Sequence, residues 1–135
     1  ATYQQVLDDN EYVGGTLKNY SYRIQLPNTP SLFGNVDIEY RINDFITEKL
    51  SLVPYYNLLY VRKFYLGYEN IARGDLKYTI PMQLVHDIGF TISEKNEKYS
   101  VSFECSNVTD ALAFDNFRLQ KPGRAFNMKL TYNLN

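Results

Sequence analysis

The sequence predicts an all-β chain that forms an antiparallel segment of a transmembrane β-barrel. Three observations lead to this prediction: side chains that alternate strictly in polarity, alternating segments longer than ordinary strands, and connections of two different lengths. Alternation is clearest at the end of the chain. One face there consists of Phe126, Met128, Leu130, Tyr132 and Leu134. The other face consists of Asn127, Lys129, Thr131, Asn133 and Asn135. A period of two residues indicates a β-strand.

Four further segments alternate in the same way: 32–43, 49–61, 82–92 and 98–108. Residues 1–6 are expected to be the end of a sixth strand. A strand of about 11 residues, tilted as in barrels, rises roughly 27 Å, which matches a bilayer core. We therefore expect the even-numbered side chains of 32–42 and 50–60 to face lipid. The polar residues expected to face the lumen are Asp37, Glu39, Arg41, Asp87, Glu104 and Lys129.

The connections between these segments alternate in length. Residues 44–48 and 93–97 are short polar turns, whereas 8–31, 62–81 and 109–122 are long loops. Because antiparallel strands reverse direction at each connection, the three long loops should gather at one end. In outer-membrane barrels the long loops are extracellular and the short turns periplasmic.

Composition excludes several classes of function. A net charge of −1 without a basic cluster argues against a nucleic-acid partner. The longest apolar runs are about four residues, against roughly 20 for a membrane-spanning helix. The single cysteine, Cys105, permits no internal disulfide, and the single histidine, His86, has no cysteine or histidine neighbours in sequence to form a metal site. We expect no enzyme activity, no cofactor and no metal.

Four short motifs carry a resemblance to a known family. They are Leu26-Pro27-Asn28-Thr29-Pro30, the stretch from Ile80-Pro81 to Val85-His86-Asp87, Asn107-Val108-Thr109-Asp110, and Pro122-Gly123-Arg124 followed by Ala125-Phe126. In their order and spacing they resemble the C-terminal part of TonB-dependent outer-membrane receptors, over roughly residues 26–135.

The resemblance implies that residues 1–135 are the C-terminal part of a plugged barrel of about 22 strands. The implied partners are the remaining strands and plug of the receptor, TonB (through the N-terminal part), outer-membrane lipid and a surface lipoprotein. The implied function is energised uptake of a scarce nutrient across the bacterial outer membrane: a siderophore, haem, cobalamin, glycan or peptide. Because five or six strands cannot close such a barrel, we expect no stable monomeric fold for this chain alone.

Substrate contacts are expected in the loops, where tyrosine offers contact area and arginine pairs with anions. The candidates are Tyr12, Tyr20, Tyr22, Arg23, Tyr65, Tyr68 and Arg73. The alternative function is a soluble small β-barrel that binds an apolar ligand, because such barrels show the same alternation.

Overall fold

The computed structural model describes residues 1–72, 78–96, 98–115 and 118–134. The chain separates into two compact units, which we call the loop unit and the sheet unit. The loop unit comprises Ala1–Gly34, Tyr60–Gln83 and Phe114–Lys121. The sheet unit comprises Asn35–Leu59, Leu84–Ala113 and Pro122–Asn135.

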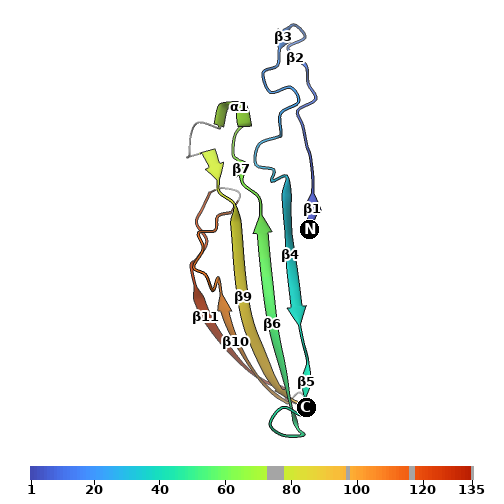
Figure 1. The fold of residues 1–135 in the computed structure, drawn as a ribbon, viewed down its shortest axis with the longest axis vertical. Coiled ribbons are helices and arrows are strands. Elements are labelled where there is room, and N and C mark those ends of the chain that lie inside the picture. Colours follow the sequence, from blue (N-terminus) through green and yellow to red (C-terminus); the bar gives the residue numbers. More distant parts are fainter. Residues whose placement is uncertain (73–77, 97, 116–117, 135) are drawn as a thin grey trace. The chain divides into compact units, whose positions relative to one another are not determined.

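Long antiparallel strands build the sheet (Figure 1). Their bounds are β4 (Leu32–Glu39), β5 (Ile42–Asn43), β6 (Leu50–Val61), β9 (Gln83–Glu94), β10 (Tyr99–Ser106) and β11 (Ala125–Tyr132). The order is β4-β6-β9-β10-β11, with β5 also pairing with β6, so each long strand lies beside its neighbours in sequence. In the loop unit, β1 (Thr2–Tyr3) pairs with Phe33 and Leu32 at the start of β4.

The five predicted strands are all present, with one interruption. The predicted strand 32–43 is divided into β4 and β5 at Tyr40 and Arg41. The Tyr40 amide donates to the Pro54 carbonyl at 3.1 Å, but proline has no N–H with which to return the bond. The ladder is therefore incomplete at this point. The predicted strand at 1–6 is reduced to β1, and Asn135 lies outside the described residues.

The register places the apolar side chains of neighbouring strands on one face, which we call the apolar face. Phe103 pairs with Phe90 on β9 and with Met128 on β11. Its ring centroid lies 5.8 Å from that of Phe90 and 6.2 Å from that of Phe126. Much of this face is uncovered, since Met128 and Leu130 are 74% and 70% exposed. Exposed apolar surface of this kind indicates contact with lipid or another protein.

The opposite face of the sheet, the polar face, is joined by hydrogen bonds between side chains. The Tyr55 hydroxyl on β6 donates to Glu104 Oε2 on β10 at 2.7 Å. It reaches Glu104 by crossing Gly89 on β9, where an added Cβ would lie 2.4 Å from the Tyr55 ring. Further along the same face, Thr91 and Ser102 share a 2.9 Å hydrogen bond. The alternation predicted from sequence thus separates an apolar face from a hydrogen-bonded one.

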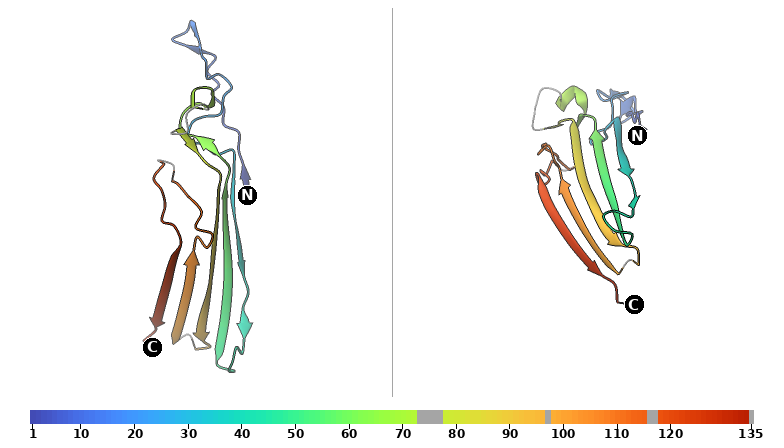
Figure 2. Two further views of the ribbon diagram at one scale, coloured as in Figure 1. Left: turned by 60° about the vertical axis from the view of Figure 1, so that its left-hand side comes forward. Right: turned by 60° about the horizontal axis from the view of Figure 1, so that its bottom comes forward.

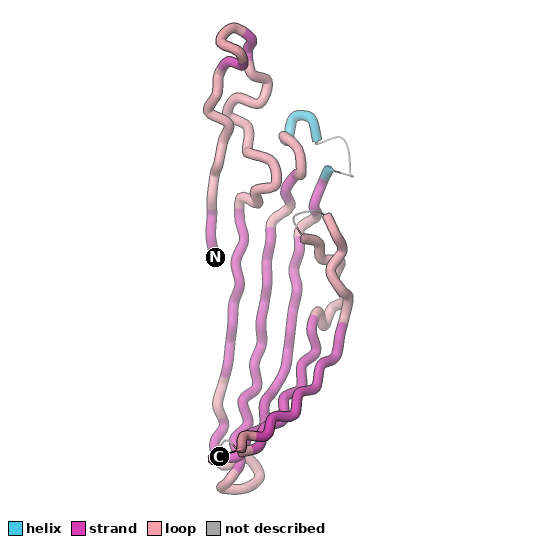
Figure 3. Tube along the Cα trace, turned by 180° about the vertical axis from the view of Figure 1, so that it is seen from behind, coloured by secondary structure: helices cyan, strands magenta, loops and turns pink. Residues whose placement is uncertain are grey.

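The sheet is all-β and antiparallel but is not a closed barrel (Figure 2). Strand β11 forms one edge, and no described residue pairs with it on the side away from β10. An open edge leaves a row of backbone N–H and C=O groups without sheet partners. Figure 3 shows the long strands of the sheet unit, and no described residue between them is helical.

The loop unit contains short elements that the sequence did not predict. Two hairpins are present: β2 (Tyr12–Val13) with β3 (Leu17–Lys18), and β7 (Phe64–Tyr65) with β8 (Thr79–Ile80). A single helical turn, α1, covers Glu69–Ala72. Segments from all three long connections belong to this one unit, as the alternation of connection lengths predicts.

Two of the motifs noted in the sequence lie against each other at an end of the sheet. The Asn107 side chain closes the turn after β10, because its Oδ1 accepts from Ala111 N at 2.9 Å and its Nδ2 donates to Ala111 O at 2.8 Å. Asp110 Oδ1 accepts from Arg124 N at 2.9 Å. An added Cβ on Gly123 would lie 2.5 Å from that same oxygen, so only glycine permits this approach. The motif residues therefore fix the strand ends.

Candidate ligand-binding site

The hairpin of β7 and β8 provides the rigid base of a cavity in the loop unit. Phe64 pairs with Ile80, and these two side chains are 5% and 0% exposed. They form the small apolar core of this unit. The partner residue Tyr65 alternates away from that core, as expected for neighbouring positions in a strand.

Backbone hydrogen bonds hold residues 25–31 against this hairpin. The Asn28 amide donates to the Tyr65 carbonyl at 2.7 Å, and Asn28 has a φ of 57°. Asparagine tolerates this left-handed conformation better than most residues. The Leu26 amide donates to Val6 O at 2.8 Å, and Gln4 N donates to Ser31 O at 2.9 Å. The N-terminal segment, residues 25–31 and β7 are thereby held together.

The cavity between these segments has a volume of about 340 Å³. Its lining consists of Tyr3, Gln5, Gln25, Leu26, Thr29, Ser31, Arg62, Lys63, Phe64, Tyr65, Gly67 and Glu69. Four of these side chains are amides or hydroxyls of Gln, Thr and Ser, and three are aromatic. Ligand sites for small molecules begin at about this volume. The arrangement suits a small molecule with several hydrogen-bonding groups.

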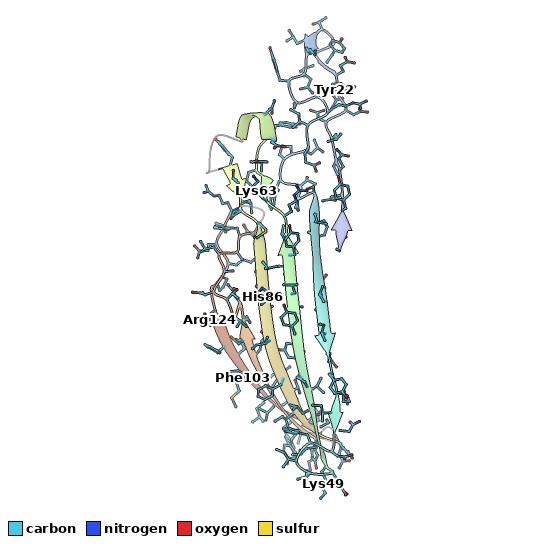
Figure 4. The ribbon with its side chains drawn as sticks, in the orientation of Figure 1. Tyr22, Lys49, Lys63, His86, Phe103 and Arg124 are labelled. Atoms are coloured by element: carbon cyan, nitrogen blue, oxygen red, sulfur yellow. The ribbon has the colours of Figure 1, made fainter. Side chains whose placement is uncertain are left out.

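The charges in the lining are asymmetric. Arg62 and Lys63 are exposed cations, and Glu69 is the lining carboxylate. Within the described part of the chain, neither cation has a carboxylate at ion-pair distance. Lys63 Nζ lies 5.6 Å from the centroid of the Tyr65 ring, which orients the ammonium without neutralising it. The cavity can therefore pair with an anionic group on a ligand. Figure 4 labels Lys63, which directly precedes β7.

The structure does not bring the predicted loop residues together at this cavity. Tyr65 lines it, but Tyr12, Tyr20, Tyr22 and Arg23 do not. Tyr20 is 89% exposed, and Tyr12 lies on the β2–β3 hairpin at 55% exposure. Arg23 lies over the Tyr22 ring, with 5.6 Å from Cζ to the centroid. The hydrogen bond from Arg23 to the Tyr22 hydroxyl raises the pKa of Arg23, so this cation is permanently charged.

The two remaining residues predicted to contact substrate are Tyr68 and Arg73. Tyr68 takes a structural contact, because its hydroxyl donates to Asp8 Oδ2 at 3.1 Å. Arg73 lies outside the described residues.

Asp8 is the hydrogen-bond centre of the loop unit. It is 8% exposed, and its carboxylate accepts from the backbone and side chain of Asn10, from Asn19 Nδ2 at 3.0 Å and from Tyr68. The Asn10 amide is the main cause that lowers the pKa of Asp8 to about 2, followed by the Asn19 side chain. A second hydrogen bond joins the two loop segments that contain Asp8 and Tyr68, because Asn70 Nδ2 donates to Tyr20 O at 2.9 Å. These bonds join residues 8–20 to residues 68–70 within the loop unit.

The predicted lumen residues are partly assembled on the polar face. Asp37, Glu39, Asp87 and Glu104 line one shallow cavity of about 260 Å³ in the sheet unit, together with Tyr55 and Asn57. Three of these carboxylates accept hydrogen bonds from the sheet unit itself: Asp37 from Asn35 and Asn57, Asp87 from the Asn107 backbone amide at 2.7 Å, and Glu104 from Tyr55 and Ser106. Arg41 and Lys129 do not line this cavity.

Sequence reasoning did not identify most of the lining of the loop-unit cavity. Gln25, Thr29 and Ser31 lie in an irregular segment, where no periodicity indicates which side chains converge. The motif Leu26-Pro27-Asn28 was noted only as part of a resemblance. Its turn-forming Pro27 and Asn28 were the available signal, because a turn there folds residues 25–31 back on themselves.

No known protein family, curated protein or solved structure matches the chain. The described residues contain no helix with the length and hydropathy that a membrane crossing requires. Among the same residues, no group of three or more His, Cys, Asp or Glu side chains is arranged to hold a metal ion.

Proposed function

We propose that this chain is the C-terminal barrel portion of a TonB-dependent outer-membrane receptor that takes part in energised nutrient uptake. The observation that carries the proposal is the two-faced open sheet. One face is apolar, with exposed large side chains on β4, β9, β10 and β11, and the other is polar and hydrogen-bonded. In a barrel wall these faces would meet lipid and the wet lumen, respectively.

The open edges support a larger assembly. An unpaired backbone group in lipid costs several kcal/mol, so a spanning sheet must close on further strands. In this proposal the remaining strands of the receptor pair with β11 and with the free part of β4, and the plug packs on the polar face. TonB acts on the N-terminal part of the receptor.

Nutrient binding is assigned to the loop-unit cavity. Its cations Arg62 and Lys63, which form no ion pair with a described residue, and its uncharged hydrogen-bonding side chains favour an anionic nutrient with several polar groups. In this proposal the loop unit is extracellular, because the long connections of outer-membrane barrels are on that side.

Sedimentation of this chain with and without detergent tests the proposal against a soluble apolar-ligand barrel. We expect the chain to aggregate in detergent-free buffer and to become monodisperse in detergent when a fragment with the remaining strands is present. Aggregation in buffer follows from the exposed apolar face and the open edges. A monodisperse, protease-resistant monomer of 135 residues in buffer would exclude the receptor and support the soluble barrel.

A further inference from the structure

A groove on the apolar face combines apolar side chains with charged ones. The groove has a volume of about 410 Å³. It is lined by Thr47, Lys49, Leu50, Ile92, Glu94, Tyr99, Ser100 and Val101. These residues come from β6, β9 and β10 and from the short turns at their ends, all within the sheet unit.

The floor of the groove suits an acyl chain. Ile92 and Val101 are directly paired between β9 and β10, and Leu50 from β6 continues the same apolar surface. Tyr99 forms a wall whose position is fixed, because its ring stacks on Tyr132 with centroids 5.0 Å apart. A chain of methylenes laid along this floor would bury apolar area on both sides of the contact.

The turn end of the groove has two charges of opposite sign. Glu94 occupies the apolar register of β9, two positions after Ile92, and its side chain is half-buried. Lys49 is exposed at the start of β6, where Figure 4 labels it. Although both side chains line the groove, they do not form an ion pair with each other, and among the described residues neither has another salt-bridge partner.

A third charged side chain, Lys98, belongs to the same short turn end of β10. Lys98 Nζ lies 5.9 Å from the centroids of both the Tyr99 and Tyr132 rings. The neighbouring Lys95, by contrast, is already paired with Asp44. Tyrosine and lysine at a strand end are typical of the membrane–water interface, where rings are buried and charges remain wet.

We propose that this groove binds one zwitterionic phospholipid, with an acyl chain on the apolar floor and the headgroup at the turn end. The phosphate pairs with Lys49, with Lys98 nearby, and the headgroup ammonium pairs with Glu94. Two separated and unpaired charges of opposite sign match a headgroup that contains both signs. A singly anionic headgroup would leave the half-buried Glu94 carboxylate without a cation. The inference rests on the proposed function, because it requires a membrane-embedded sheet.

Native mass spectrometry of the receptor assembled with this chain tests the inference. The probes are phosphatidylethanolamine and phosphatidylglycerol, each added in detergent at matched concentrations. We expect one retained phosphatidylethanolamine, and Lys49→Glu should reduce its occupancy roughly two- to five-fold, the range for an exposed ion pair. The double variant Lys49→Glu/Glu94→Lys should restore the occupancy, because it exchanges the charges without removing either.

A steric pair of variants tests the floor of the groove. Val101→Phe fills the groove and should abolish lipid retention. Leu130→Phe is its matched control, because Leu130 pairs with Val101 on the same face but lies outside the groove, and it should leave retention unchanged.

Equal retention of the two lipids, or unchanged retention after Lys49→Glu, would overturn the inference. So would failure of the charge exchange to restore binding in an assembled receptor. The proposed function fails separately, if the chain does not assemble into a detergent-soluble receptor at all.

Discussion

Replacement of Gly89 by alanine should break a side-chain hydrogen bond between two other strands, from Tyr55 on β6 to Glu104 on β10. The Tyr55 ring crosses this glycine to reach Glu104, and a Cβ there would lie 2.4 Å from Tyr55 Cζ and Oη. It would also lie 2.6 Å from the Phe103 carbonyl oxygen. Carbon atoms in contact are about 3.5–4.0 Å apart, so the ring must move by roughly 1 Å. The 2.7 Å hydrogen bond to Glu104 cannot survive that displacement.

The expected loss combines two effects. Overpacking at a well-packed position costs about 1–3 kcal/mol. A hydrogen bond to a charged acceptor contributes about 1.5–3 kcal/mol, and we take the lower end because both partners are half-exposed. Gly89→Ala should therefore lower the free energy of unfolding by about 2.5–4.5 kcal/mol.

A double-mutant cycle separates these effects in the proposed receptor assembly, with urea unfolding in lipid vesicles as the measurement. Tyr55→Phe should cost about 1.5 kcal/mol in the wild-type background and close to nothing in the Gly89→Ala background, because the bond is already lost there. Equal costs in the two backgrounds would refute the reasoning, since Gly89 would then not be the crossing point of the Tyr55–Glu104 bond.

Two further predictions concern the loop unit. In the proposed receptor, the double variant Arg62→Gln/Lys63→Gln should weaken nutrient binding at least about tenfold in an uptake assay, because a bond to a charged group contributes about 1.5–3 kcal/mol. The triple variant Tyr20→Ala/Tyr22→Ala/Arg23→Ala serves as the comparison outside the cavity. A larger effect of the triple variant would assign the substrate to those residues. Asp8 has a folded pKa of about 2, below its ordinary value, so its contribution to loop stability is complete above about pH 4 and is lost as the pH falls toward 2. Pepsin cleavage within residues 8–24 should therefore rise over that interval in the wild type, and an Asp8→Asn variant should show no such step.

The strands could be predicted from the sequence because one local property determines them. In β10 and β11 each side chain belongs to one face by its parity alone, and the observed pairs Val101–Leu130 and Phe103–Met128 keep that parity. Strand ends were harder to predict. The predicted strand 82–92 stops two residues short of Glu94, because a carboxylate in the apolar register breaks the pattern.

The loop-unit cavity could not be predicted because no local property determines it. Its walls meet through a few backbone bonds between residues far apart in sequence, such as Asn28 N to Tyr65 O. Side chains such as Gln25 and Ser31 acquire a shared surface only through those bonds. The tyrosine and arginine content of the long loops predicted candidate residues in the loop unit. Tyr20 and Arg23 do not line the cavity, so composition does not predict which side chains come together there.

The motifs at the end of β10 and the start of β11 have a structural role, which can be distinguished from a role in ligand specificity. Asn107 and Asp110 have positive φ values of 50° and 54°, and Asn and Asp are the non-glycine residues that best accept this conformation. Gly123 is required by the approach of Asp110 Oδ1. These residues specify how β10 ends and β11 begins, and none of them lines the loop-unit cavity. The motifs at the end of β10 and the start of β11 therefore concern how the sheet is built, whereas Leu26 and Thr29 of another motif line the cavity. If the proposed function is correct, the chemistry of the nutrient must be inferred from the side chains that line the cavity, above all Arg62, Lys63 and the side-chain amides of Gln5 and Gln25.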